Sequence, residues 1–259
     1  MLTQPISKEE ILAHLADSLP VFVFDEIDST NTEARRRFLA GCPAPALFVA
    51  DGQTAGRGRQ GKSFYSPKGS GLYLSLLIPA KEAFGDVPVT TLAAVGVARA
   101  VERVSGIGCG IKWVNDLYVG GKKVAGLLAE ALSAPDGTRA AVMGVGINVW
   151  ADEFPAELPE AGALFSGDSV PCADFRNRLA AAVAEEVLLA ASAKEKAPLM
   201  EEYRKRSCVL GKRVYFLQNG ARYEGIAHGI TEEGGLCVRL DGGEERVLQS
   251  GEITLRAIG

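Results

Sequence analysis

A glycine-rich basic segment, Gly56–Ser63, holds the residues best suited to chemistry. Its spacing matches both the Walker A loop and the dinucleotide-binding fingerprint, which hold phosphate at the N-terminus of the helix that follows. Here a proline and two glycines follow instead, and residues 72–78 have the continuous apolar pattern of a buried strand. We therefore expect a phosphate-binding loop that belongs to neither of those two families.

Two arginines in this loop are suited to binding phosphate. Arg57 and Arg59 lie two residues apart, so in an extended loop their side chains should point the same way. Gly56 and Gly58 let the backbone approach a ligand closely. Paired guanidinium groups bind phosphate oxygens bidentately and stabilise charge that develops during phosphoryl or nucleotidyl transfer. The alternative is a flexible, solvated basic loop. Because the Walker A interpretation is rejected, Lys62 is not expected to act as the phosphate-binding lysine of that motif.

A second group of candidates surrounds a hairpin that the Gly-Gly pair at 120–121 predicts. Asn115 and Asp116 could bind Mg²⁺ through their side-chain oxygens. Lys112 and Lys123 bring positive charge to the same hairpin, although a lysine beside a turn is often only a solvated surface residue. Trp113, which lies between them in the sequence, is expected in the core.

Neutral polar residues and glycines complete the candidate set. The segment Ser29–Asn31 follows a predicted strand and begins a helix, with Thr30 and Glu33 forming a capping box. Such neutral donors and acceptors suit an uncharged polar ligand, although one of them could simply cap the helix. Farther along, Gly144 and Gly146 leave room on one face of a strand for a ring or a backbone.

The hydrophobic periodicity that surrounds these residues predicts an α+β fold with two domains. Three consecutive hairpin strands make a mixed or antiparallel sheet with packed helices, rather than a doubly wound sheet. From Gly211 onward, short alternating segments are separated by turn signals every 8–12 residues, which predicts a small β-barrel. We place a catalytic domain at 1–207 and the barrel at 208–259.

The composition excludes several classes of protein. A net charge of −4 argues against general nucleic-acid binding, and no apolar run approaches the roughly 20 residues of a membrane span. Five widely spaced cysteines favour a reducing cytoplasm over a disulfide scaffold. With only two histidines, neither beside a plausible nucleophile, hydrolysis with a histidine base is not expected. Activation of a carboxylate by a nucleotide suits the remaining lysines, arginines and carboxylates.

Four motifs, taken in order, resemble those of the biotin protein ligases: Asp28–Asn31, Gln53–Gly61, Lys112–Asp116 with Lys123–Gly126, and Gly144–Asn148. The resemblance covers about residues 20–258. It implies a biotin/lipoate ligase-like domain followed by an SH3-like barrel. It also implies a two-step reaction, in which biotin and ATP form biotinyl-5′-AMP and pyrophosphate, and biotin then passes to a lysine of a biotin carboxyl carrier protein.

The same resemblance assigns roles to individual residues. Ser29, Thr30 and Gln53 would hold the neutral ring system of biotin, while the loop at Arg57–Arg59 closes over biotin and phosphate. Catalytic roles fall to Arg59, Lys123 and Asp116, and Mg²⁺ would be bound by Asn115 and Asp116. The full set of implied ligand-binding residues is Ser29, Thr30, Asn31, Gln53, Gly56, Arg57, Gly58, Arg59, Lys112, Asn115, Lys123, Gly126, Gly144 and Asn148, the last at the adenine end.

Two departures from the family pattern qualify these expectations. Val114 stands where the family usually has proline, and we expect the strand and the activity to persist there. Only about 20 residues precede the first predicted strand, too few for the family's winged-helix domain, so no DNA partner is expected. A sister lipoate ligase and a non-catalytic biotin-responsive regulator remain alternatives, and the oligomeric state is open, a homodimer included.

Overall fold

The computed structural model describes residues 4–169, 172–218, 220–251 and 253–255. A seven-stranded sheet with strand order β1-β2-β3-β7-β6-β5-β4 forms its larger part. Its strands are β1 (Val21–Ile27), β2 (Ala46–Gln53), β3 (Gly71–Pro79), β4 (Gly110–Lys112), β5 (Asp116–Val119), β6 (Lys122–Ser133) and β7 (Arg139–Asn148). Only the β1–β2 pairing in this sheet is parallel. The prediction of a mixed sheet is confirmed.

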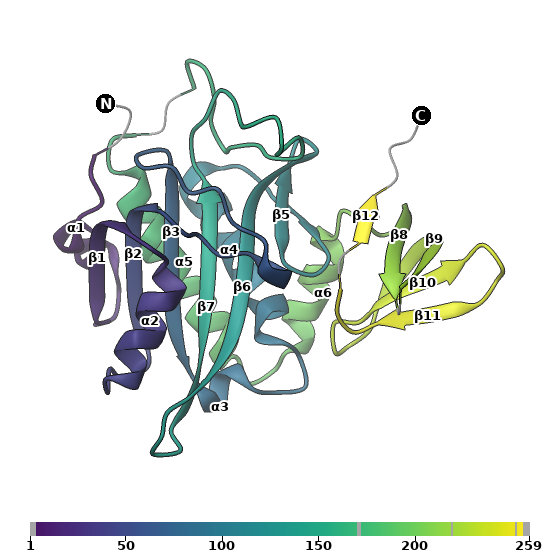
Figure 1. Ribbon diagram of the computed structural model, residues 1–259, viewed down its shortest axis with the longest axis horizontal. Coiled ribbons are helices and arrows are strands. Elements are labelled where there is room, and N and C mark those ends of the chain that lie inside the picture. Colours follow the sequence, from purple (N-terminus) through teal and green to yellow (C-terminus); the bar gives the residue numbers. More distant parts are fainter. Residues whose placement is uncertain (1–3, 170–171, 219, 252, 256–259) are drawn as a thin grey trace.

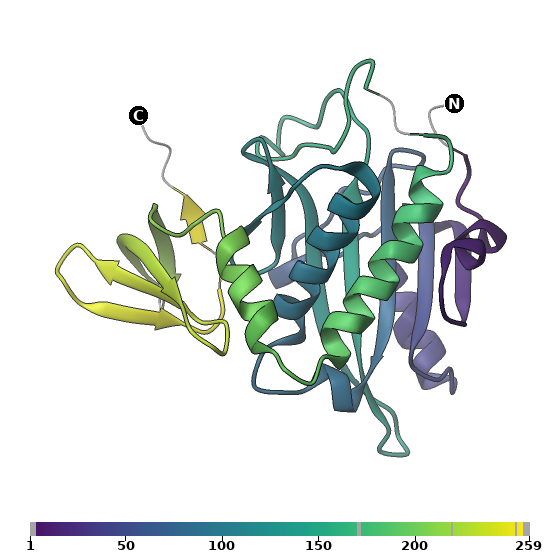
Figure 2. The same cartoon turned by 180° about the vertical axis from the view of Figure 1, so that it is seen from behind.

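Helices cover both faces of this sheet. They are α1 (Lys8–His14), α2 (Thr30–Leu39), α3 (Ala80–Ala83), α4 (Val89–Ser105), α5 (Phe175–Ser192) and α6 (Ala197–Arg206). α4, α5 and α6 pack on one face (Figure 2), and α2 packs on the other (Figure 1). Alternating residues of β2 point to opposite faces of the sheet. Leu47 and Val49 pack in the core with α4 and α5, whereas Phe48 packs with Phe38 of α2. None of these described helices is long and apolar enough to span a membrane.

A second, five-stranded antiparallel sheet follows α6. It has the order β11-β10-β9-β8-β12, formed by β8 (Arg213–Gln218), β9 (Ala221–Ile230), β10 (Leu236–Leu240), β11 (Glu245–Leu248) and β12 (Ile253–Leu255). This arrangement is consistent with the small barrel that the turn spacing predicted. Trp113 is buried, as expected, and its Nε1 donates to the Gly234 carbonyl oxygen at 2.9 Å, which links the two sheets.

Two local expectations were wrong. The N-cap of α2 is Ser29 rather than Thr30, and Thr30 begins the helix with its hydroxyl turned to Gln53. Val114 does not continue a strand, because residues 113–115 form a turn between β4 and β5, with a cis Trp113–Val114 peptide bond. The hydroxyl of Tyr203 in α6 donates to the Val114 carbonyl oxygen at 3.1 Å, so this helix supports the turn.

Gly96 allows α4 and α5 to pack closely. A Cβ atom at this position would lie 2.7 Å from the carbonyl oxygen of Glu186 in α5. Gly96→Ala should lower the free energy of unfolding by roughly 1–2 kcal/mol, since overpacking outweighs the gain of about 1 kcal/mol in helix propensity. Urea unfolding measures the change. Gly108→Ala is the control, because a Cβ there meets nothing within 4 Å. A Gly96→Ala protein as stable as the wild type would contradict this packing.

Candidate functional site

A cavity of about 570 Å³ lies on the α2 side of the large sheet. Its walls are the glycine loop, the start of α2, the β5–β6 hairpin, β7 and the segment 154–161, and Gly251, Ile253 and Thr254 add a contribution from the second sheet. Thirteen of the ligand-binding residues predicted from the sequence line this cavity: Ser29, Thr30, Asn31, Gln53, Arg57, Gly58, Arg59, Lys112, Asn115, Lys123, Gly126, Gly144 and Asn148. The predicted catalytic residue Asp116 lines it too. Gly56 does not line the cavity, and a Cβ added there would collide with the Phe64 carbonyl oxygen at the base of the loop.

Neutral, hydrogen-bonded side chains form one end of the cavity. The backbone amide of Thr30 donates to Gln53 Oε1 at 2.9 Å, the Thr30 hydroxyl lies 3.1 Å from the same oxygen, and Gln53 Nε2 donates to Ser66 Oγ at 2.9 Å. The fully buried Ser75 hydroxyl is hydrogen-bonded to Thr30 Oγ1 at 2.8 Å and to Asn31 Oδ1 at 2.6 Å. These contacts fix the orientation of the amides before any ligand arrives. Sequence reasoning missed Ser75 because it lies within an apolar strand.

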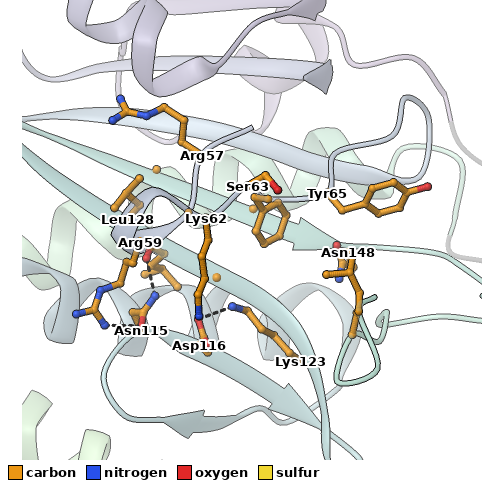
Figure 3. A pocket seen from close by; sticks show the side chains of 18 of the residues that line it. Arg57, Arg59, Lys62, Ser63, Tyr65, Asn115, Asp116, Lys123, Leu128 and Asn148 are labelled. Carbon is orange, nitrogen blue, oxygen red and sulfur yellow. Dashed lines mark hydrogen bonds and ion pairs between the residues drawn. The ribbon is translucent and has the colours of Figure 1, made fainter. Parts of the chain in front are cut away.

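Cationic side chains gather at the other end. Lys123 Nζ lies 2.8 Å from Asp116 Oδ1, an ion pair that lacks the alignment of a hydrogen bond. Arg59 Nη1 donates to Asn115 Oδ1 at 3.0 Å, and Asn115 Nδ2 donates to the Leu127 carbonyl oxygen at 2.8 Å. Lys62 was not among the binding residues predicted from the sequence, but it lines the cavity and extends toward Asp116 (Figure 3). The neutral and cationic ends therefore share one cavity.

Arg57 and Arg59 point apart, contrary to expectation (Figure 3). Arg57 binds both carboxylate oxygens of Glu130, with Nη1 donating to Oε2 at 3.0 Å and Nη2 lying 2.8 Å from Oε1. The loop is not extended at Arg59, where a single 3₁₀ turn, Arg59–Gly61, begins. Gln60 in that turn has a φ of 54°, and the chain reverses direction there.

Glycines in the strands below make room for neighbouring side chains. A Cβ at Gly146 would collide with the ring of Phe64, and Gly126 lies against the same ring. Gly144 has no room for a side chain because the Asn31 amide occupies that space. The sequence correctly indicated room for a ring on this face, but the ring belongs to Phe64, which sequence reasoning did not select.

The segment 154–161 closes a third side of the cavity. Lys112 Nζ donates to Glu160 Oε2 and to the Tyr118 hydroxyl, each at 3.2 Å, and that hydroxyl donates to Glu160 Oε2 at 2.7 Å. The hydrogen bond from Tyr118 lowers the pKa of Glu160, and the charge of Lys112 acts in the same direction. Burial raises the pKa of Tyr118. Asn148 Nδ2 donates to the Gly162 carbonyl oxygen at 2.8 Å, so this predicted adenine reader also holds the segment in place.

Known proteins are similar to this chain in sequence and in fold. The biotin/lipoate A/B protein ligase family matches residues 23–148, and the biotin protein ligase C terminal domain matches residues 209–256. A biotin--[acetyl-CoA-carboxylase] ligase of Paracoccus denitrificans is 30% identical, over 87% of this chain and 96% of that relative. The chain belongs to the biotin protein ligase family. Its two family matches coincide with the two sheets, while the predicted boundary at 207/208 stays a prediction.

Two further similarities bear on the biotin protein ligase assignment. The biotin protein ligase from Aquifex aeolicus in complex with biotin and ATP superimposes with a TM-score of 0.74 and 28% identity, covering 92% of this chain and 98% of that one. The bifunctional ligase/repressor BirA of Bacillus spizizenii is 39% identical over 145 residues, which are 55% of this chain. That alignment spans only 45% of the length of this relative.

Ser75 tests the neutral end without any assumption about the ligand. Ser75→Ala leaves buried polar groups of Thr30 and Asn31 without their partner, so we expect the free energy of unfolding to fall by roughly 1–3 kcal/mol. Urea unfolding gives the value. The matched control is Ser192→Ala, whose hydroxyl makes an exposed bond to the Leu189 carbonyl oxygen, and it should change stability by less than about 0.5 kcal/mol. Equal effects of the two substitutions would contradict the network.

Proposed function

We propose that this chain is a biotin–[acetyl-CoA-carboxylase] ligase, which uses ATP to activate biotin and transfers it to a lysine of a biotin carboxyl carrier protein. The observation that carries this proposal is the single cavity with a neutral end at Thr30 and Gln53 and a cationic end at Arg59 and Lys123. Biotin has the matching polarity, because its ring system is neutral and polar and its carboxylate meets the phosphates. A relative with bound biotin and ATP shares the fold.

The first step needs charge stabilisation more than proton transfer. An oxygen of the biotin carboxylate attacks the α-phosphorus of ATP, the bond from that phosphorus to the β-phosphate bridging oxygen breaks, and pyrophosphate leaves. Arg59 and Lys123 stabilise the negative charge on the α-phosphate in the transition state. Their contacts with Asn115 and Asp116 hold both cations in place before the ligands bind.

The second step transfers biotin. The neutral amine of the carrier lysine attacks the carboxyl carbon of biotinyl-5′-AMP, an amide bond forms, the amine gives up a proton, and AMP leaves. The mixed anhydride is reactive, so the protein mainly has to position the two partners. We place this step in the cytoplasm, as the cysteine pattern predicts, with the carrier domain as partner.

Asp116 fits a magnesium site better than Asn115 does. Asp116 offers a buried carboxylate oxygen that lies 2.8 Å from Lys123 Nζ, whereas the Asn115 oxygen already accepts from Arg59. One carboxylate is a sufficient protein contribution, because Mg²⁺ usually binds mainly through phosphates and water. When bound, Mg²⁺ neutralises phosphate charge. We therefore assign Asp116 as the protein ligand and Asn115 as the residue that orients Arg59.

The direct test is transfer of labelled biotin. The purified protein with Mg²⁺, ATP, labelled biotin and a carrier domain should place label on one carrier lysine, and a carrier with arginine at that lysine should stay unlabelled. Omission of ATP should abolish labelling. Labelled lipoate in place of biotin provides the comparison with the sister activity. Failure to label with biotin would refute the proposal, and labelling with lipoate alone would identify a lipoate ligase.

Loss of either cation at the phosphate end should slow adenylation. We expect Arg59→Ala and Lys123→Ala each to lower the rate of biotinyl-5′-AMP formation by roughly ten- to thousandfold, because each removes charge that stabilises the transition state. Exchange of labelled pyrophosphate into ATP, dependent on biotin, measures this rate. Lys205→Ala, which removes an exposed lysine paired with Glu201 in α6, should keep the wild-type rate. Wild-type exchange in either site variant would overturn that residue's role.

A further inference from the structure

The glycine loop is a compact hairpin rather than an open loop. Gly58 N donates to the Lys62 carbonyl oxygen at 2.7 Å, and Phe64 N donates to the Gly56 carbonyl oxygen at 2.9 Å. An isolated bridge between Arg57 and Ser63 joins its two arms. Whatever holds the arm at Arg57 therefore holds the whole hairpin, including its tip, where Arg59 contacts Asn115.

The Arg57 arm is held to the central sheet by Glu130 of β6. Arg57 uses two guanidinium nitrogens on this carboxylate, the bidentate geometry in which arginine binds carboxylates most strongly. Glu130 Oε2 also accepts from Asn31 Nδ2 at 2.9 Å, so the carboxylate is itself oriented by a residue that is 4% exposed. Figure 3 shows Arg57 directed away from the group formed by Arg59, Lys62 and Lys123.

The other arm of the hairpin is held by the neutral end of the cavity. Ser66, two residues beyond Phe64, donates to the Phe64 carbonyl oxygen at 2.9 Å and accepts from Gln53 Nε2. Gln53 contacts Thr30, and Ser75 is hydrogen-bonded to both Thr30 and Asn31. Asn31 in turn donates to Glu130, the residue that holds the Arg57 arm. A closed path of polar contacts thus connects both arms of the hairpin to the same buried cluster.

We propose that Glu130 and Arg57 are positioning residues: their ion pair holds the hairpin where Arg59 and Phe64 line the cavity, and Arg57 does not itself bind phosphate. The kinetic effects expected of this ion pair rest on the proposed ligase reaction. The two arginines of the loop have different roles. Arg59, at the hairpin tip among the cationic residues, acts on phosphate, whereas Arg57, on the outer arm, serves as an anchor. The same Glu130 contact couples the anchor to Asn31 of the neutral end.

A double-mutant cycle tests the assignment. Glu130→Gln removes the charge but keeps an oxygen for Asn31, and Arg57→Met removes the guanidinium while keeping the length of the side chain. We expect each to lower kcat/KM for biotinyl-5′-AMP formation by roughly tenfold, since small misplacements of a reacting geometry cost this much or more. The double variant should be no slower than either single one. If Arg57 bound phosphate, Glu130→Gln would keep or raise the wild-type kcat/KM, and only Arg57→Met would raise KM for ATP.

A second measurement does not depend on activity. Trypsin should cut Glu130→Gln within Arg57–Lys62 at least about threefold faster than the wild type, because the hairpin loses an anchor that contributes to local stability. The control is Glu185→Gln, which breaks the ion pair between Arg103 of α4 and Glu185 of α5. This pair is matched in exposure, because the side chains of Arg103 and Glu185 are 48% and 27% exposed, and those of Arg57 and Glu130 are 45% and 24% exposed. The control should match the wild type in both assays. Unchanged cleavage of Glu130→Gln would overturn the anchor, whereas absence of biotinyl-5′-AMP in the wild type would refute only the ligase reaction.

Discussion

The hydroxyl of Ser75 is the contact on which the site depends, because it joins Thr30 to Asn31 beneath the cavity. Buried polar groups are costly unless each finds a partner, so this hydroxyl restricts the positions of both neighbours. Thr30 in turn orients Gln53, and Asn31 orients Glu130. The strand opposite must leave room for Asn31, which explains glycine at 144. A single buried hydroxyl thus sets the neutral end and the attachment of the glycine hairpin.

The cationic end is pre-positioned by neighbours that the ligand must share or displace. Arg59 is held by Asn115, Lys123 by Asp116, and Lys112 by Glu160 together with Tyr118. In the proposed reaction, an incoming phosphate would compete with such contacts, but they would spare the reorganisation that otherwise accompanies the transition state. The separation of a neutral end from a cationic end follows from which elements meet. The neutral end is formed by α2, β2 and β3, whereas the cationic end is formed by the glycine hairpin, with Arg59 and Lys62, and by β6, with Lys123.

Local sequence patterns predicted the elements well, and predicted contacts between distant elements poorly. Periodicity located β3, α4 and the hairpin strands because burial of one face is a local property. The four motifs located half of the residues that line the cavity. Ser75 was missed because one polar residue in an apolar strand gives no signal until its partners are known. Glu130 was missed because its partner Arg57 lies 73 residues away. The expectation that Arg57 and Arg59 point the same way in an extended loop was wrong, because the loop is not extended at Arg59, which spacing alone could not predict.

The most direct test of this account is a crystal structure of the protein with a non-hydrolysable analogue of biotinyl-5′-AMP. We expect the ring system of biotin against Thr30 and Gln53, the phosphate between Arg59 and Lys123, and Arg57 still paired with Glu130. An analogue bound outside this cavity, or bound in it with its phosphate away from both cations, would contradict the division of the cavity into a biotin end and a phosphate end.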